Sequence, residues 1–325
     1  MQGRTHTTIA WAVMFVLLAI DLIWFPLSRL TFPPSSTLRL GWTALAVVVL
    51  VYVPVVIRYW LRADSSLASR FTAAAAESLG FLVYGAAFVI AMGILGMTFS
   101  YLSVSLALPL RDAELAAIDR ALGFDWREFL TVTNAHPVIA QMLKAAYRSS
   151  GPQLVLLLIF LSVTRRRDRL VEFLAIFAMS LLLTMVGMTL VPAEGAYAFF
   201  APMPVQYSNF GPDSGMWHHA TFVALRTQAA PVLDFADAQG LVTFPSFHTI
   251  LAIITSYAVR DIRYVAVPTA TLNLVVVVST LPEGGHYLID LIAGGLIAVF
   301  VIFVARRFTF AVPRRFLDFG KAIIS

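Results

Sequence analysis

The sequence lacks cysteine and is poor in charged residues. The absence of cysteine excludes disulfide bonds and thiolate chemistry, although it does not decide the cellular compartment. Only 13% of the 325 residues are Asp, Glu, Lys or Arg, whereas roughly 25% is usual in soluble domains. Hydrophobic residues make up 59% of the chain, and its mean hydropathy is +0.83. These values exclude an ordinary soluble domain and indicate an integral membrane protein.

Apolar runs dominate what is present. Most of them approach the ~20 residues that a helix needs to cross a bilayer, and a helix satisfies its backbone polar groups internally. We therefore predict an all-α, polytopic membrane helical bundle of about eight transmembrane helices, forming a single integral membrane domain over residues 1–325. The first run is too long for a cleaved signal, so we expect it to be retained. The predicted spans are 9–30, 40–60, 79–98, 152–164, 170–191, 244–259, 264–281 and 286–305.

Lys and Arg gather in the short links between these runs. Because such residues mark the cytoplasmic side of a membrane, we predict cytoplasmic N and C termini. Segment 192–243 has Arg226 as its only basic residue, which places it on the outer (periplasmic or lumenal) face of a bacterial-type inner membrane. The net charge of +5 then follows from topology and does not indicate nucleic acid binding. The residues predicted to be cytoplasmic are Arg4, Arg58, Arg62, Arg70, Arg165, Arg166, Arg167, Arg169, Arg260, Arg263, Arg306, Arg307, Arg314, Arg315 and Lys321.

Two segments outside the apolar runs are long. Residues 110–150 carry apolar side chains at helical spacing, broken by Gly123 and Pro137, which predicts short amphipathic helices at the outer membrane interface. Residues 192–243 are rich in Pro and Gly and exceed the usual length of a connection, which predicts a functional, lid-like outer loop. The aromatic residues that we interpret as an interfacial belt are Phe99, Tyr101, Tyr197, Phe199 and Phe200.

The first of two histidine-bearing segments reads Phe244-Pro245-Ser246-Phe247-His248. Proline is favoured in the first turn of a helix because its missing N–H costs nothing there. We therefore expect His248 about one turn into its span, at the outer membrane face.

The second histidine-bearing segment covers residues 284–290. His286 and Asp290 are four apart and are expected to share a helix face, so that the carboxylate fixes one ring nitrogen and leaves the other free as a nucleophile. His248 can supply the proton that a leaving alcohol needs. Gly285 and the first N–H groups of the helix are expected to receive an anionic group. The pattern predicts a phosphoester-cleaving site with His248, His286 and Asp290 as catalytic residues.

In these segments the chain resembles the type 2 phosphatidic acid phosphatase superfamily of membrane phosphoesterases and phosphotransferases. Its motif P-S-x-H matches residues 245–248, and its motif S-R-x5-H-x3-D matches residues 279–290 except for one position. The resemblance implies a six-helix core and a phosphohistidine formed on His286. It further implies that Asp290 orients His286, that His248 acts as acid and base, and that neither a metal nor an organic cofactor is used.

The basic residues of the superfamily motifs are missing. Thr280 stands where the third motif has arginine. When the proline of the first motif, K-x6-R-P, is aligned on Pro192, Val191 and Thr184 stand at the arginine and the lysine. The expected replacements that would bind phosphate are Lys144, Arg148, Arg226, Ser246 and Gly285.

These losses resemble one branch of the superfamily. The histidine segments, together with Asp119-Arg120-x-Leu122-Gly123-Phe124-Asp125-Trp126, look like inositol phosphorylceramide synthases. This resemblance covers residues 118–295 and implies a phospholipid donor and a ceramide-like lipid alcohol as acceptor. A phosphodiester donor carries one negative charge fewer than a phosphomonoester, which fits a site with fewer cations.

Other readings remain open at this point. A lipid phosphate phosphatase of the same superfamily would use the same residues, and a non-catalytic lipid-binding relative would explain the missing cations. A haem-binding electron carrier would use His248 and His286 as axial ligands. Ser246 lacks the Gly-x-Ser-x-Gly context of a serine nucleophile, and the adjacent His218 and His219 are interpreted as solvated rather than as metal ligands.

Overall fold

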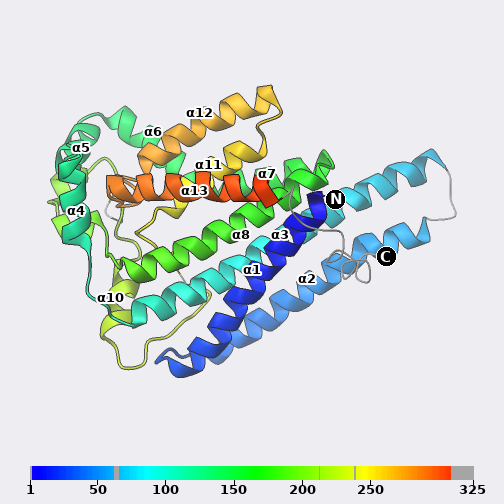
Figure 1. The fold of residues 1–325 in the computed structure, drawn as a ribbon, viewed down its shortest axis with the longest axis horizontal. Helices are drawn as coiled ribbons and strands as arrows, with labels where there is room; N and C mark the ends of the chain where they lie inside the picture. Colours follow the sequence, from blue (N-terminus) through cyan, green and yellow to red (C-terminus); the bar gives the residue numbers. More distant parts are fainter. Residues whose placement is uncertain (1, 62–65, 212, 238, 309–325) are drawn as a thin grey trace.

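The protein is a bundle of α-helices (Figure 1). The computed structural model describes residues 2–61, 66–211, 213–237 and 239–308. In these ranges there is no β-strand, only an isolated bridge between Thr31 and Val232. The prediction of an all-α membrane bundle is confirmed. Of the residues predicted to be cytoplasmic, Arg62, Arg314, Arg315 and Lys321 lie outside the described part of the chain.

All eight apolar segments lie on helices, but the helices differ in length. Five are long and apolar enough to cross a membrane. Helices α6 (Pro137–Arg148) and α7 (Ser150–Val163) meet at a 45° bend and qualify as a sixth span if they are taken together. Helices α11 (Phe247–Ala258) and α12 (Arg263–Ser279) are shorter and apolar. The five long helices are α1 (Gln2–Trp24), α2 (Pro34–Trp60), α3 (Leu67–Ser105), α8 (Arg167–Leu190) and α13 (Leu288–Phe308).

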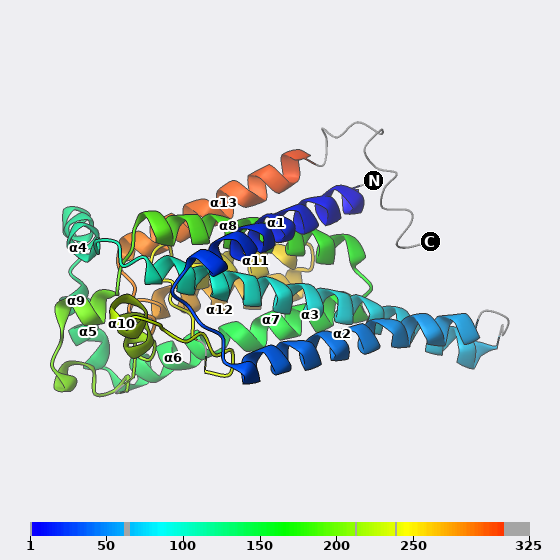
Figure 2. The same cartoon turned by 90° about the horizontal axis from the view of Figure 1, so that it is seen from below.

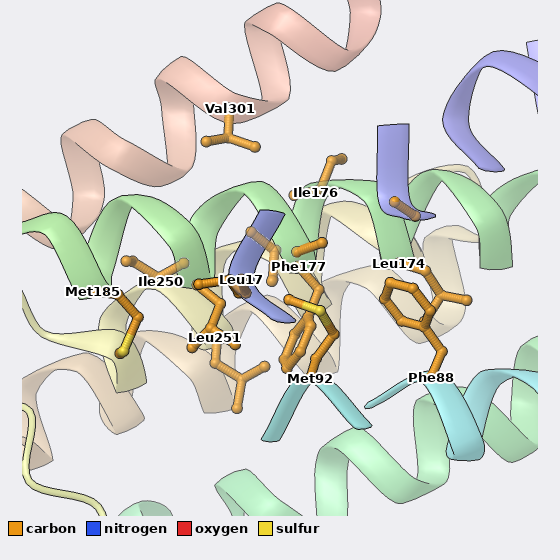
Figure 3. Close-up of a cluster of buried hydrophobic side chains, with 14 of the residues drawn as sticks. Leu17, Phe88, Met92, Leu174, Ile176, Phe177, Met185, Ile250, Leu251 and Val301 are labelled. Carbon is orange, nitrogen blue, oxygen red and sulfur yellow. The ribbon is translucent and has the colours of Figure 1, made fainter. Parts of the chain in front are cut away.

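Helix α8 is the centre of the bundle. It contacts α1, α3, α11 and α13, and its side chains are buried along most of its length. Because lipid tails are as apolar as leucine, such contacts stabilise the bundle through close packing rather than through removal from water. Figure 3 shows this core, where α8 packs against residues of the other four helices. The residues labelled there are Leu17, Phe88, Met92, Leu174, Ile176, Phe177, Met185, Ile250, Leu251 and Val301.

Segment 110–150, which the sequence predicts on the outer face, folds into short helices. Helix α4 (Asp112–Ala121) is followed by Gly123 in the left-handed region (φ +78°). Helix α5 (Trp126–Asn134) is capped by Asp125, whose side chain accepts a hydrogen bond from the N–H of Glu128. Helix α6 (Pro137–Arg148) begins at its proline and leads into α7 (Ser150–Val163). The helices and their breaks therefore follow the local sequence signals.

Segment 192–243 is packed against the outer helices. It contains α9 (Ala196–Phe200), the short η2 (Pro204–Tyr207) and α10 (His219–Thr227). These elements gather with α4 and α5 at one end of the bundle (Figures 1 and 2). There α4, α5, α6, α9 and neighbouring loop residues share a second hydrophobic cluster, which we call the outer core, whereas Phe222 and Leu225 of α10 pack into the main core. The outer core consists of Leu115, Ala116, Trp126, Leu130, Ala140, Leu143, Ala193, Ala196, Tyr197, Phe210 and Tyr287.

A charge network lies at the opposite end of the bundle, between the first turns of α8 and the link from α11 to α12. Glu172 accepts hydrogen bonds from Arg169 at 2.8 Å and from Arg260 at 2.9 Å, and Arg169 also pairs with Asp261. The guanidinium of Arg260 lies 3.5 Å from the centre of the Tyr257 ring. The basic links therefore share one end of the bundle, and the histidine-bearing segments lie toward the other.

The orientation in the membrane is tested by single cysteines. Ala229 is exposed in the outer loop, and Arg166 is exposed in the α7–α8 link. Because native cysteine is absent, Ala229→Cys should be labelled by an impermeant thiol reagent on intact cells, and Arg166→Cys only after permeabilisation. The reverse pattern would place the outer loop in the cytoplasm and contradict the predicted topology.

Candidate active site

His286 and Asp290 form a buried pair at the start of α13. Nδ1 of His286 lies 3.3 Å from Oδ2 of Asp290, and the two side chains are 3% and 0% exposed. The same carboxylate oxygen accepts a hydrogen bond from the backbone N–H of Tyr287 at 2.9 Å. When the imidazole donates from Nδ1 to the carboxylate, its tautomer is fixed and Nε2 carries the lone pair. The pair is therefore suited to present Nε2 as a nucleophile.

The expectation that both residues share a helical face is wrong. Helix α13 begins at Leu288, so His286 precedes it, and Asp290 in the first turn reaches back to the ring. Gly285 turns the chain with φ +67°, a conformation that glycine adopts without steric cost. A Cβ on Gly284 would lie 2.8 Å from Cδ2 of His286. The two glycines thus allow the tight turn that precedes His286.

His248 lies opposite His286 at the start of α11. The two ring centroids are 6.5 Å apart with the planes inclined at 64°, and Tyr147 of α6 stacks on His248 at 4.5 Å. Contrary to the expectation from Pro245, α11 begins at Phe247, so that His248 is its second residue. The reason is that the hydroxyl of Ser246, rather than the proline, provides the helix cap.

Ser246 is occupied by structural hydrogen bonds. Its side chain accepts from the N–H of Thr249 at 3.3 Å and lies 3.2 Å from the Thr249 hydroxyl, and it is fully buried. Its backbone N–H donates to the backbone oxygen of Asp290 at 3.0 Å. A Cβ on Gly294 would lie 2.6 Å from the backbone oxygen of Ser246. Ser246 and Gly294 therefore join the starts of α11 and α13 closely.

The loop that carries His286 is hydrogen-bonded to residues of segments 110–150 and 192–243. Four carbonyl groups within residues 281–285 accept hydrogen bonds from residues 68 to 155 positions earlier in the chain. Tyr197, which we interpreted from the sequence as an interfacial residue, is buried and is one of the donors. The donors and acceptors are Trp126 Nε1 to Leu281 O (3.3 Å), Tyr197 OH to Pro282 O (2.7 Å), Gly215 N to Glu283 O (2.9 Å) and Ala196 N to Gly285 O (2.8 Å).

Asp119 of α4 caps α13 from a distance in sequence. Its two carboxylate oxygens accept hydrogen bonds from the N–H groups of Leu288 at 2.8 Å and Ile289 at 2.9 Å, and the residue is 2% exposed. Burial raises the pKa of Asp119, and these two donors oppose that rise. Asp112, two turns earlier, accepts a hydrogen bond from the hydroxyl of Tyr287 at 3.0 Å. One face of α4 thus bonds both the Tyr287 side chain and the first two backbone N–H groups of α13.

The expectation that the start of α13 offers free N–H groups to a phosphate is therefore wrong. The N–H groups of Tyr287, Leu288 and Ile289 donate to carboxylates of the protein itself. Helix N-termini attract anions through these groups and the helix dipole. Here Asp119 and Asp290 provide the anionic charge, so a phosphate has to be held by other donors.

Lys144 and Arg148 lie beside the site on α6. Both interact electrostatically with Glu283, three residues before His286. Glu283 is buried, accepts a hydrogen bond from the Ser214 hydroxyl at 3.0 Å, and has its pKa raised by burial. Since Tyr147 stacks on His248, one stretch of α6 brings two cations and an aromatic ring to the histidines.

Arg226 lies beside a small cavity next to the site. Val191, the position where the first superfamily motif has arginine, lines the same cavity, as do Thr243 and Phe244. The backbone of Thr243 interacts with His286. One guanidinium nitrogen of Arg226 donates to the backbone oxygen of Leu108 at 2.9 Å. A cation therefore adjoins the place from which the motif arginine is missing.

His218 and His219 are not the solvated pair that the sequence suggested. His218 is 7% exposed, and its Nδ1 is buried with no hydrogen-bond partner in the part of the chain that the structure describes. Burial lowers the pKa of His218 to about 4, with further contributions from His286 and His219. His219 instead pairs with Glu194 at 3.4 Å. His218 is thus a third imidazole in the surroundings of His286.

The described residues contain no group of three or more His, Cys, Asp or Glu side chains that is placed to hold a metal ion.

The sequence model of the PAP2 superfamily, which comprises the type 2 phosphatidic acid phosphatases, matches residues 113–304, more than half of the chain. The chain belongs to the PAP2 superfamily. Comparisons with curated proteins and with solved structures gave no match.

Membership assigns this PAP2 protein to the membrane enzymes that act as phosphatases or phosphotransferases on lipid phosphoesters. The matched region runs from α4 into the last turns of α13, so it contains both histidine segments. Helices α1, α2 and α3 precede it. Helices α1 and α3 pack on α8 and on each other, α2 packs on α3, and together they widen the bundle outside the matched part.

The motif positions that lack basic residues in this PAP2 protein have structural roles. Thr280 is fully buried, donates from its hydroxyl to Val277 O at 2.7 Å, and accepts at its carbonyl from Gly284 and His286. Thr184 is also buried and donates to Ser180 O at 2.8 Å. An arginine at either position would require displacement of packed atoms.

Sequence reasoning missed Asp112, Asp119, Glu283, Tyr147 and His218. One signal was available for the two aspartates, which are seven residues apart and so lie on one face of a helix. Glu283 adjoins the glycines before His286, but neither its burial nor its neighbours follow from local spacing.

The cap on α13 can be tested by Asp119→Ala. This change leaves two buried N–H groups without acceptors, so we expect the free energy of unfolding to fall by about 2 kcal/mol and lipid turnover to fall with it. The measurement is thermal unfolding and activity in detergent. Glu114→Ala on the same helix removes an exposed ion pair with Arg111 and should change neither. Equal effects of the two substitutions would contradict the capping role.

Proposed function

We propose that this protein moves a phosphate-linked head group from a glycerophospholipid to a lipid alcohol through a phosphohistidine on His286. The observation that carries this proposal is the buried His286–Asp290 pair with His248 facing it, ring centroids 6.5 Å apart. A phosphoryl group between the rings would meet a nucleophile on one side and a proton donor on the other. Membership of the PAP2 superfamily supports the same class of chemistry.

In the first step, Nε2 of His286 attacks the phosphorus of the donor. The P–N bond forms while the P–O bond to diacylglycerol breaks, and protonated His248 gives its proton to the leaving oxygen. Asp290 keeps Nδ1 of His286 protonated and stabilises the positive charge that the ring gains. In the second step, neutral His248 takes the proton of the acceptor alcohol, whose oxygen attacks phosphorus and releases His286.

The distribution of cations favours a phosphodiester donor. No arginine occupies the Thr280 position, and Lys144 and Arg148 share their charge with the carboxylate of Glu283. Each missing charge-assisted hydrogen bond weakens the hold on a phosphate oxygen by about 1.5–3 kcal/mol. A phosphodiester group carries one negative charge and loses less from this than the dianion of a phosphomonoester.

The outer elements favour transfer over hydrolysis. Segments 110–150 and 192–243 share the outer core and clamp the loop of His286. A site enclosed by apolar packing limits the access of water to a reactive intermediate. An alcohol on a second lipid, such as a ceramide-like acceptor, would then intercept the phosphohistidine at the outer face of the membrane.

The second candidate function is a lipid phosphate phosphatase. It is favoured by three cations near the site. Lys144 and Arg148 interact with Glu283 in the loop before His286, and Arg226 lines the cavity beside Thr243 and Phe244. Water would then replace the lipid alcohol in the second step, and the same catalytic residues would serve.

The catalytic residues are tested by His286→Ala and Asp290→Asn. Loss of the nucleophile should abolish turnover, and loss of the carboxylate should lower it by about 10⁴-fold, as for other orienting carboxylates. His136→Ala is the control, because His136 is exposed and hydrogen-bonds only within its own segment, to Val132 O. Activity is measured on purified protein in detergent. Full activity of His286→Ala would remove it as the nucleophile.

The reaction class is tested by competition between substrates. Purified protein should transfer a head group from a glycerophospholipid to ceramide faster than it releases phosphate from phosphatidic acid, because the site has few cations for a dianion. Both products are measured by lipid mass spectrometry and phosphate release. Rapid phosphate release without head-group transfer to any offered alcohol would identify a plain lipid phosphatase.

A further inference from the structure

His218 has no role in the two steps described above, although it lies buried near the nucleophile. Its side chain is enclosed at the start of α10, next to Trp217, whose ring centroid is 5.4 Å away. Its Nδ1 is fully buried and has no hydrogen-bond partner among the described residues. Buried polar atoms in folded proteins are nearly always hydrogen-bonded, so an unpaired one calls for a ligand or another explanation.

The segment that carries His218 lies directly on the loop of His286. The hydroxyl of Ser214 donates to Glu283, and the N–H of Gly215 donates to the backbone oxygen of the same residue at 2.9 Å. A Cβ on Gly285 would lie 3.2 Å from the Cα of Gly215, so the two backbones touch. His218 follows this contact by one turn and interacts electrostatically with His286.

We propose that His218 is a third catalytic imidazole, which donates a hydrogen bond to a non-bridging oxygen of the phosphoryl group bound between His286 and His248. The proposal rests on the proposed function and adds a substrate-binding residue to it. In either tautomer a neutral imidazole carries one N–H donor. Such a donor stabilises the charge that develops on the oxygen during attack.

A neutral donor suits this site better than a cation would. Burial keeps His218 uncharged at pH 7, since its pKa is lowered to about 4. The position where the superfamily motif has arginine is the buried Thr280, whose hydroxyl is already bonded to Val277. His218 would therefore supply a hydrogen bond without adding charge, and the site would favour the monoanionic phosphodiester.

The adjacent residue provides a matched control. His219 has the same chemistry, but it pairs with Glu194 at 3.4 Å and keeps part of its surface exposed. Two substitutions at His218 separate hydrogen bonding from packing. His218→Phe keeps a ring and removes the donor, whereas His218→Asn loses ring volume and keeps an N–H donor.

The experiment compares His218→Phe, His218→Asn and His219→Ala with the unaltered protein, all purified in detergent. The substrate is the phosphoester that the unaltered protein turns over, whether by head-group transfer or by phosphate release, so failure of the transferase proposal does not affect the result. Binding of a non-hydrolysable phosphonate analogue of a glycerophospholipid is measured by calorimetry as a readout independent of turnover. Thermal unfolding reports on packing.

We expect His218→Phe to lower kcat by about 10²-fold, the usual effect of removing one donor to a developing oxyanion. Analogue binding should weaken by about fivefold, and His218→Asn should recover most of both losses. His219→Ala should retain the rates of the unaltered protein. The proposal is overturned if His218→Phe matches His219→Ala in rate and in binding. It is also overturned if His218→Asn is as poor as His218→Phe, because an N–H donor at this position would then restore neither rate nor binding.

Discussion

The two hydrogen bonds from the first N–H groups of α13 to Asp119 are the constraint on which the site depends. They fix where the helix begins, and therefore where the preceding turn must place His286. A carboxylate from another helix can do this because it satisfies two buried donors at once and complements the helix dipole. The conformation of the turn is restrained further, since its carbonyls accept hydrogen bonds from segments 110–150 and 192–243.

The acidic and the basic side chains near the histidines lie on different elements. Carboxylates occupy the start of α13, where Asp290 contacts His286 and Asp119 accepts from the first N–H groups. The cations Lys144, Arg148 and Arg226 lie on α6 and α10. The N–H groups at the helix terminus are thereby occupied by carboxylates of the protein itself. The outer core contains Tyr287 and residues of α4, α5, α6 and α9, so it links the start of α13 to the helix that carries Lys144 and Arg148.

The sequence predicted contacts between residues that are close along the chain and missed contacts between residues that are far apart along it. His286 and Asp290 are four residues apart, so spacing alone indicated their interaction, and apolar runs indicated every long helix. Asp119 lies 169 positions from its partner Leu288, and no periodic pattern reveals such a contact. At α11 two local signals competed, and the serine cap prevailed over the proline. Helix α3 begins twelve residues before its predicted span, because residues 67–78 are rich in alanine, which favours a helix.

Gly294 shows how a residue without a functional group can govern the geometry of a candidate active site. Its missing side chain lets α13 lie against the backbone of Ser246, two residues before His248. The separation of the two imidazoles therefore depends on a helix contact that leaves no room for a Cβ. The separation of the candidate histidines is accordingly set in part by how closely α11 and α13 pack against each other.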